Sequence, residues 1–118
     1  MFKRFILVVI MTLFSTSLIA EGNKLAYDFS FKNIDGGEIK LSEYKNKIIV
    51  VVNVASKCGF TNQYKDMQKI WEDYQKKNVI ILGVPSSDFN QELETSEKIK
   101  TFCETTFGIT FPMTTKVS

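Results

Sequence analysis

The sequence predicts a single α/β domain built around parallel strands, and three observations carry this prediction. Two apolar runs rich in β-branched residues, 48–55 and 79–84, have the composition of central strands buried on both faces of a parallel sheet. Between them, residues 64–74 carry apolar side chains at three- and four-residue spacing, which is typical of an amphipathic helix. This strand–helix–strand order implies a right-handed crossover between parallel strands.

Further elements are predicted on either side of this unit. Residues 29–31 and 39–41 form a β-hairpin, because Asp35-Gly36-Gly37 between them supplies the positive φ values of a tight turn. A polar loop over 86–94 leads into a helix over 96–107, which Ser96 with Glu97 would cap. Residues 111–118 have the pattern of an entry into a strand with no closing helix after it, so we expect the domain to be truncated.

The N-terminal segment has the anatomy of a secretory signal peptide. Lys3 and Arg4 precede an apolar run over 5–19, and Ala20 offers a small residue at the expected cleavage point. We therefore expect residues 1–20 to be removed, residues 21–118 to form the domain, and the protein to be exported to the periplasm. The alternative is a retained membrane anchor, which would be the chain's only contact with a membrane.

Composition excludes several classes of function. The chain has 118 residues, of which 44% are hydrophobic and 24% charged, as in an ordinary globular domain. A net charge of +2 gives no electrostatic case for nucleic-acid binding. The chain contains no histidine, which excludes Ser-His-Asp and Cys-His catalysis and removes most zinc sites.

Cys58 is the candidate nucleophile. It follows the first buried strand and precedes the amphipathic helix, at the sheet edge where α/β proteins place their chemistry. The positive end of the helix dipole and the neighbouring Lys57 favour the thiolate, so imidazole is not needed for activation. The alternative from position alone is a buried free cysteine, or half of a structural disulfide, since exported proteins often pair their cysteines.

The residues around Cys58 resemble the active-site signature of the glutathione peroxidases. The resemblance runs in register over essentially the whole mature chain, through segments 41–47, Asn53-Val54-Ala55-Ser56-Lys57-Cys58-Gly59-Phe60-Thr61, 81–85, 99–103 and 107–113. It implies a thioredoxin-like fold, here with an N-terminal hairpin and incomplete at the C-terminal end. It also implies that a hydroperoxide oxidises Cys58 to a sulfenic acid, which glutathione or a thioredoxin-like dithiol reduces, with no metal or organic cofactor.

The sequence departs from the family pattern at three places. Asp88 stands where the family has a catalytic Gln, in a loop one residue shorter than usual. The family's Trp-Asn segment would lie beyond Ser118, and Trp71 is expected in the core instead. Cys103 falls one residue away from the resolving cysteine of thioredoxin-dependent members, so we expect it to contribute little to resolving the sulfenic acid.

Other functions remain open at this stage. A thiol–disulfide oxidoreductase would have Cys-x-x-Cys, but position 61 is Thr. A peroxiredoxin would have a different loop around its cysteine. A non-catalytic periplasmic binding protein on the same fold is the remaining alternative, which the Asp88 substitution and the short loop leave open.

Overall fold

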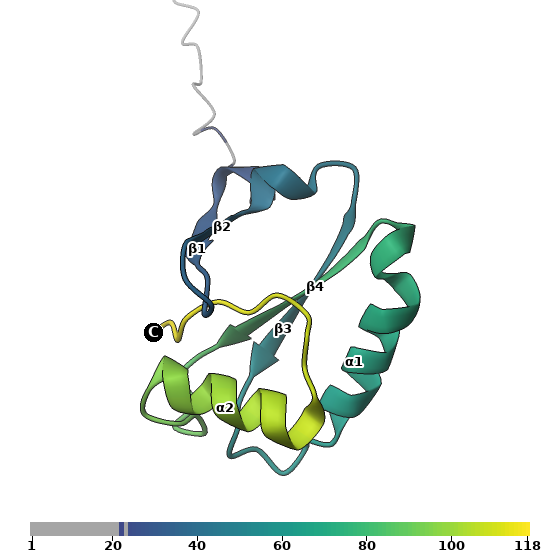
Figure 1. Cartoon of the computed structure of the whole chain (residues 1–118). Helices are drawn as coiled ribbons and strands as arrows, with labels where there is room; N and C mark the ends of the chain where they lie inside the picture. The colour runs from purple at the N-terminus through teal and green to yellow at the C-terminus, as the bar shows by residue number, and fades with distance from the viewer. Residues whose placement is uncertain (1–21, 23) are drawn as a thin grey trace, which may run out of the picture.

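The computed structural model describes residue 22 and residues 24–118, so the expected signal peptide over 1–20 lies outside the described residues. Four strands and two α-helices follow the predicted order, with short 3₁₀ turns between them (Figure 1). The elements are η1 (Ala26–Asp28), β1 (Ser30–Lys32), β2 (Glu38–Lys40), η2 (Leu41–Tyr44), β3 (Ile48–Val54), α1 (Gln63–Tyr74), η3 (Gln75–Lys77), β4 (Val79–Pro85) and α2 (Ser96–Phe107).

The predicted strand pairings are confirmed. β1 and β2 pair antiparallel as a hairpin, and β3 and β4 pair parallel from Ile48 opposite Val79 to Val54 opposite Pro85. We had expected entry into a strand over 111–118, but the segment after α2 forms no continuous strand. It extends the sheet by isolated bridges instead, of which Gly83 with Met113 is parallel and Asn33 with Thr114 joins it to the hairpin.

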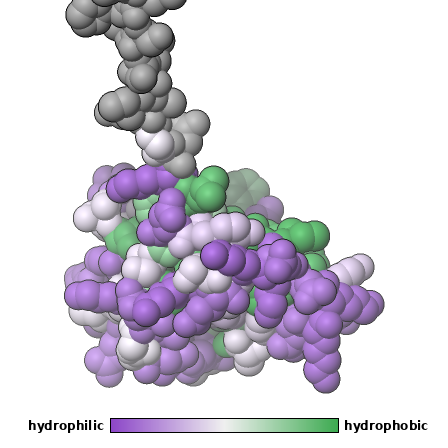
Figure 2. Space-filling model, turned by 90° about the horizontal axis from the view of Figure 1, so that it is seen from above, coloured by the Kyte–Doolittle hydropathy of each residue, from purple (hydrophilic) through white to green (hydrophobic). Residues whose placement is uncertain are grey.

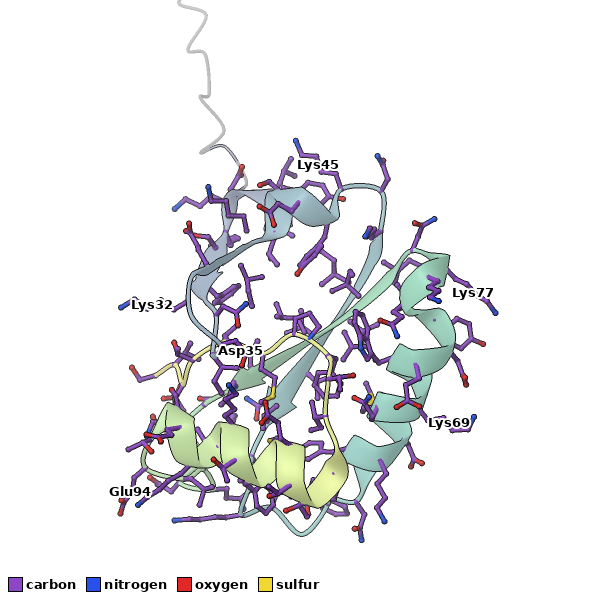
Figure 3. All side chains as sticks on the ribbon, in the orientation of Figure 1. Lys32, Asp35, Lys45, Lys69, Lys77 and Glu94 are labelled. Carbon is purple, nitrogen blue, oxygen red and sulfur yellow. The ribbon has the colours of Figure 1, made fainter. Side chains whose placement is uncertain are left out.

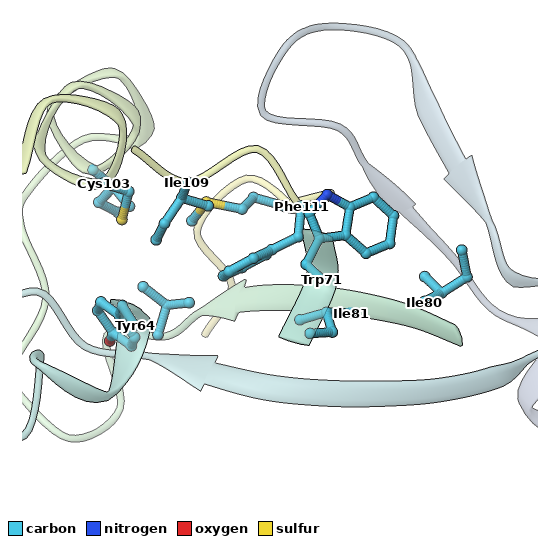
Figure 4. Close-up of a cluster of buried hydrophobic side chains, with 10 residues drawn as sticks. Tyr64, Trp71, Ile80, Ile81, Cys103, Ile109 and Phe111 are labelled. Atoms are coloured by element: carbon cyan, nitrogen blue, oxygen red, sulfur yellow. The ribbon is translucent and has the colours of Figure 1, made fainter. Parts of the chain in front are cut away.

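Two apolar clusters lie on opposite faces of β4. Ile81 packs with Tyr64 and Trp71 of α1 and with Ile99 and Cys103 of α2 in the main core (Figure 4). The next residue, Leu82, points the other way and packs with Ile39 and Leu41 of the hairpin region. Both helices therefore share one face of the sheet, while the hairpin covers part of the other.

The expectation that β3 is buried on both faces is wrong. Ile48 is 67% exposed and Val51 is 61% exposed. Among the described residues β3 pairs with β4 alone, and the hairpin side chains pack on Leu82 and Val84 of β4 rather than on Val51. A β-branched run predicts a strand, but its burial depends on what covers each face.

Polar side chains fasten the helices to the rest of the domain. Buried Gln68 of α1 accepts from the Thr110 N–H at 2.9 Å and donates to the Thr110 hydroxyl at 2.8 Å, which ties α1 to the chain after α2. Lys100 of α2 forms an ion pair with Asp35 of the hairpin turn at 2.7 Å. Most other charged groups, such as Lys32, Lys45, Lys69 and Lys77, project outward (Figure 3).

The N-terminal cap of α2 is one residue earlier than predicted. The hydroxyl of Thr95, not Ser96, accepts the N–H of Lys98 at 3.2 Å. Ser96 serves the C-terminal segment instead, because its hydroxyl accepts the N–H of Lys116 at 2.9 Å. Thr and Ser are both favoured at the N-cap, so the sequence alone does not show whether Thr95 or Ser96 caps the helix.

The surface is largely hydrophilic. Seen from above, hydrophobic side chains gather near the start of the described chain (Figure 2), where Leu25 and Phe29 are exposed. No helix within residues 24–118 is long and apolar enough to span a bilayer.

Gly83 leaves no room for a side chain against the main core, and its replacement should destabilise the domain. A Cβ at this position would lie 3.1 Å from both Met113 and Phe111 and 3.2 Å from Val54. We expect Gly83→Ala to lower the free energy of unfolding by about 1–3 kcal/mol, the usual cost of overpacking. Gly59→Ala is the matched control, because its Cβ would meet nothing within 4 Å. Equal stability of the two variants in urea titrations would contradict this packing.

Candidate active site around Cys58

The backbone between β3 and Cys58 is held at every N–H by a different acceptor. The Ala55 N–H donates to the Tyr64 hydroxyl at 2.7 Å, and the Ser56 N–H donates to Glu92 Oε1 at 3.2 Å. The Lys57 N–H donates to the Gln91 carbonyl and the Cys58 N–H to the Ala55 carbonyl, at 2.8 and 3.0 Å. Buried polar groups normally find such partners, and here three of the four come from α1 and from the loop after β4, while the fourth is the Ala55 carbonyl of the same segment.

The sulfur of Cys58 receives a backbone donor from its own loop. The Phe60 N–H lies 3.5 Å from Cys58 Sγ. The helix begins directly after the loop, as predicted: α1 starts at Gln63, and turns over residues 59–62 separate it from Cys58. The donor on the sulfur is therefore the local N–H of Phe60, in addition to the positive end of the helix dipole that the sequence indicated.

Cys58 opens into a pocket of about 230 Å³ whose rim is aromatic. Phe60 and Phe89, exposed by 72% and 66%, stand at the pocket, and Val52 and Met67 add apolar walls. Three amide side chains complete the lining together with Cys58 and Tyr64; they are Asn53, Gln63 and Gln91. A half-buried thiol with an apolar wall and nearby amides can meet a small polar group attached to an apolar tail.

The structure does not bring Asp88 to this pocket. Asp88 is exposed, and its N–H donates to the Ser86 hydroxyl at 3.2 Å. Its loop neighbours Phe89 and Gln91 line the pocket instead. The role of Asp88 stays a prediction, while Gln91 is an amide that we had not singled out and that lies beside Cys58.

Cys103 is wholly buried in the main core and differs sharply from half-buried Cys58. Burial, with smaller contributions from the negative charges of Glu92 and Glu104, raises the pKa of Cys103 from 9.0 to about 12. A thiol that stays protonated at neutral pH is a poor nucleophile. This is consistent with the expectation that Cys103 contributes little to resolving a sulfenic acid on Cys58.

Tyr64 and Glu92 are functional candidates that sequence reasoning missed. Tyr64 was predicted only as part of the apolar spacing of the helix over 64–74, yet its hydroxyl accepts the Ala55 N–H. Burial raises the pKa of Tyr64 to about 12, so it stays a neutral phenol. Glu92 was one polar residue in a polar loop, and nothing local marks it as buried. Within residues 24–118, no group of three or more acidic or cysteine side chains is arranged to hold a metal ion.

A parallel strand–helix–strand unit with a free, half-buried cysteine after its first strand defines a thiol protein of the thioredoxin-like class. The family model for glutathione peroxidase matches residues 26–118, and the chain belongs to this family. The family predicted from the Cys58 motif is thereby confirmed.

Characterised relatives show the same relationship. The chain is 42% identical over 92 residues to the glutathione peroxidase-like peroxiredoxin 2 of Saccharomyces cerevisiae, covering 77% of this chain and 57% of that protein. It is 39% identical over 101 residues to a hydroperoxy fatty acid reductase of Synechocystis, covering 85% and 60%. The chain therefore spans less than two thirds of the length of these relatives.

Solved structures confirm the thioredoxin-like α/β fold. The crystal structure of apo Trgpx superposes with a TM-score of 0.57 at 31% identity, covering 81% of this chain and 56% of that one. A thioredoxin-family thiol:disulfide interchange protein from Chlorobium tepidum gives a TM-score of 0.64 at 20% identity, covering 76% and 57%. The latter likeness shows the fold alone.

The raised pKa of Cys103 predicts a loss of stability at alkaline pH. The folded state holds this proton up to about pH 12, whereas the unfolded thiol releases it near 9.0. The contribution to stability is therefore complete below pH 9 and is lost as the pH rises from 9 to about 12. We expect urea titrations to show this fall in the wild type and a smaller fall in Cys103→Ala, where the raised pKa values of Tyr64, Tyr44 and Lys100 still contribute. Parallel profiles for the two proteins would contradict it.

Proposed function

We propose that this chain is the thiol-bearing part of a peroxidase that reduces hydrogen peroxide or organic hydroperoxides to water or alcohols. One observation carries the proposal: Cys58 opens half-exposed into an apolar pocket with a backbone N–H on its sulfur. Membership of the glutathione peroxidase family supports the same chemistry. Such an enzyme would serve in defence against oxidative stress.

The reaction begins with attack of the Cys58 thiolate on the terminal oxygen of the hydroperoxide. The new S–O bond forms as the O–O bond breaks, so the sulfur loses two electrons and becomes a sulfenic acid. The departing alkoxide takes a proton from solvent and leaves as alcohol, or as water when the substrate is hydrogen peroxide. A reducing thiol then condenses with the sulfenic acid and releases water, and a second thiol restores Cys58 through disulfide exchange.

The pocket favours hydroperoxides that carry an apolar group. Phe60, Phe89 and Met67 offer apolar contact area that hydrogen peroxide cannot use. The Synechocystis relative is a hydroperoxy fatty acid reductase, which supports the same preference in the present chain. Exposed aromatic side chains at the pocket would also suit the docking of glutathione or of a thioredoxin-like protein as the reductant.

The site of action is proposed to be the periplasm. The support is the signal-peptide anatomy of residues 1–20, with Lys3 and Arg4 ahead of the apolar run. N-terminal sequencing of protein from cells distinguishes a chain that begins near Glu21 from one that keeps Met1 in the membrane.

Replacement of the sulfur tests the proposed chemistry. We expect Cys58→Ser to abolish hydroperoxide consumption in the presence of a thiol reductant, because a serine hydroxyl forms no comparable nucleophile at neutral pH. Serine is close in size to cysteine and leaves the backbone hydrogen bonds of residues 55–58 possible, so circular dichroism should be unchanged. A variant that retains most of the wild-type rate would exclude Cys58 as the nucleophile and favour the non-catalytic binding protein.

A further inference from the structure

Two adjacent residues of the loop after β4 hold the backbone that carries the nucleophile. The Gln91 carbonyl accepts the Lys57 N–H at 2.8 Å, and Glu92 Oε1 accepts the Ser56 N–H at 3.2 Å. We propose that Glu92 is a positioning residue, whose buried carboxylate fixes the Ser56 backbone and so aims Cys58 Sγ into its pocket. This inference rests on the proposed peroxidase function for its catalytic meaning.

The carboxylate of Glu92 is placed as a backbone acceptor and not as half of a surface ion pair. Glu92 is only 8% exposed. Its Oε1 also accepts the Leu93 N–H at 2.8 Å, while its Oε2 is buried without a hydrogen-bond partner. No lysine within residues 24–118 forms an ion pair with it. Burial of a carboxylate costs free energy unless hydrogen bonds offset that cost. The N–H contacts from Ser56 and Leu93 therefore constrain both the loop after β3 and the loop after β4.

The loop that carries Glu92 is itself anchored, as a positioning role requires. Lys116 Nζ donates to the Leu93 carbonyl at 3.2 Å and to the Glu94 carbonyl at 2.6 Å. On the other side, the Ser87 N–H donates to the Val117 carbonyl at 3.2 Å. Lys116 and Val117 therefore hold the loop that carries Glu92, and the Glu92 contact with the Ser56 N–H in turn restricts the position of Ser56.

The carboxylate of Glu92 also acts on Cys103 through its charge. Glu92 contributes to the raised pKa of Cys103, after the larger effect of burial. The Oε1 contact meanwhile orders the segment that carries Cys58. The same side chain thus helps to keep Cys103 protonated and to present Cys58, which would direct oxidation to the accessible sulfur.

Two nearly isosteric substitutions of Glu92 distinguish the effect of its hydrogen bond to Ser56 from the effects of its side-chain volume and its charge. Glu92→Met fills a similar volume but removes the acceptor, whereas Glu92→Gln keeps a carbonyl oxygen for the Ser56 N–H and removes the charge. Glu94→Gln is the control, because Glu94 pairs with Lys98 on the surface. For each protein we would measure the rate of Cys58 sulfenic acid formation with cumene hydroperoxide in single turnovers, and amide hydrogen exchange at Ser56 and Lys57.

We expect Glu92→Met to slow sulfenic acid formation by about tenfold or more, the scale set by misplacement of a reacting group. Its Ser56 and Lys57 amides should exchange faster, while Glu92→Gln and Glu94→Gln keep most of the wild-type rate and protection. An unchanged rate in Glu92→Met would overturn the proposal, and so would an equal loss in Glu92→Gln. If Glu92→Met does not fold, retention of rate and protection in Glu92→Gln supports the proposal and their loss overturns it.

The failure of the peroxidase function would look different. In that case the wild type itself would form no sulfenic acid with cumene hydroperoxide. Amide exchange and the alkylation rate of Cys58 by iodoacetamide would still decide the role of Glu92, because neither needs a peroxide. Unchanged exchange at Ser56 in Glu92→Met would overturn the positioning role in that case as well.

Discussion

The parallel pairing of β3 with β4 is the constraint on which the rest of the site depends. Because the strands run in the same direction, Val54 and Pro85 end side by side, and the two following loops leave the sheet at the same edge. The first loop carries Cys58 and the second carries Glu92. Residues 36 positions apart can therefore share a hydrogen bond, between the Ser56 N–H and the Glu92 carboxylate.

As a consequence, the two cysteines lie in different environments. Cys58 ends a segment, residues 55–58, whose backbone N–H groups are all engaged, and its sulfur lies at an open pocket. Cys103 lies on the buried side of α2 in the main core, where burial keeps it protonated. The same strand pairing produces both environments, since the core formed by Ile81, Val54 and α2 closes over Cys103 while the loop emerges from the sheet edge.

Sequence patterns predicted the elements better than their burial. The hairpin, both β-branched runs and both helices were predicted because their signals are local: turn glycines, β-branched composition and helical spacing. Exposed Ile48 and Val51 were assigned to the interior, because sequence pattern does not show which neighbours cover a face. Cys58 was found from a motif, whereas Glu92 and the Tyr64 hydroxyl act through contacts with distant backbone groups. Such contacts exist only once the loops are adjacent in space.

The proposed chemistry resides on Cys58 and not on Cys103. Mass spectrometry of the protein treated with hydroperoxide in the presence of a sulfenic acid trap tests this most directly. We expect a trapped adduct on Cys58, an unmodified Cys103 and little linkage between them, since a disulfide would need the two Cα atoms within about 7 Å and the core to open around Cys103. A dominant disulfide-linked peptide pair, or a first adduct on Cys103, would contradict it.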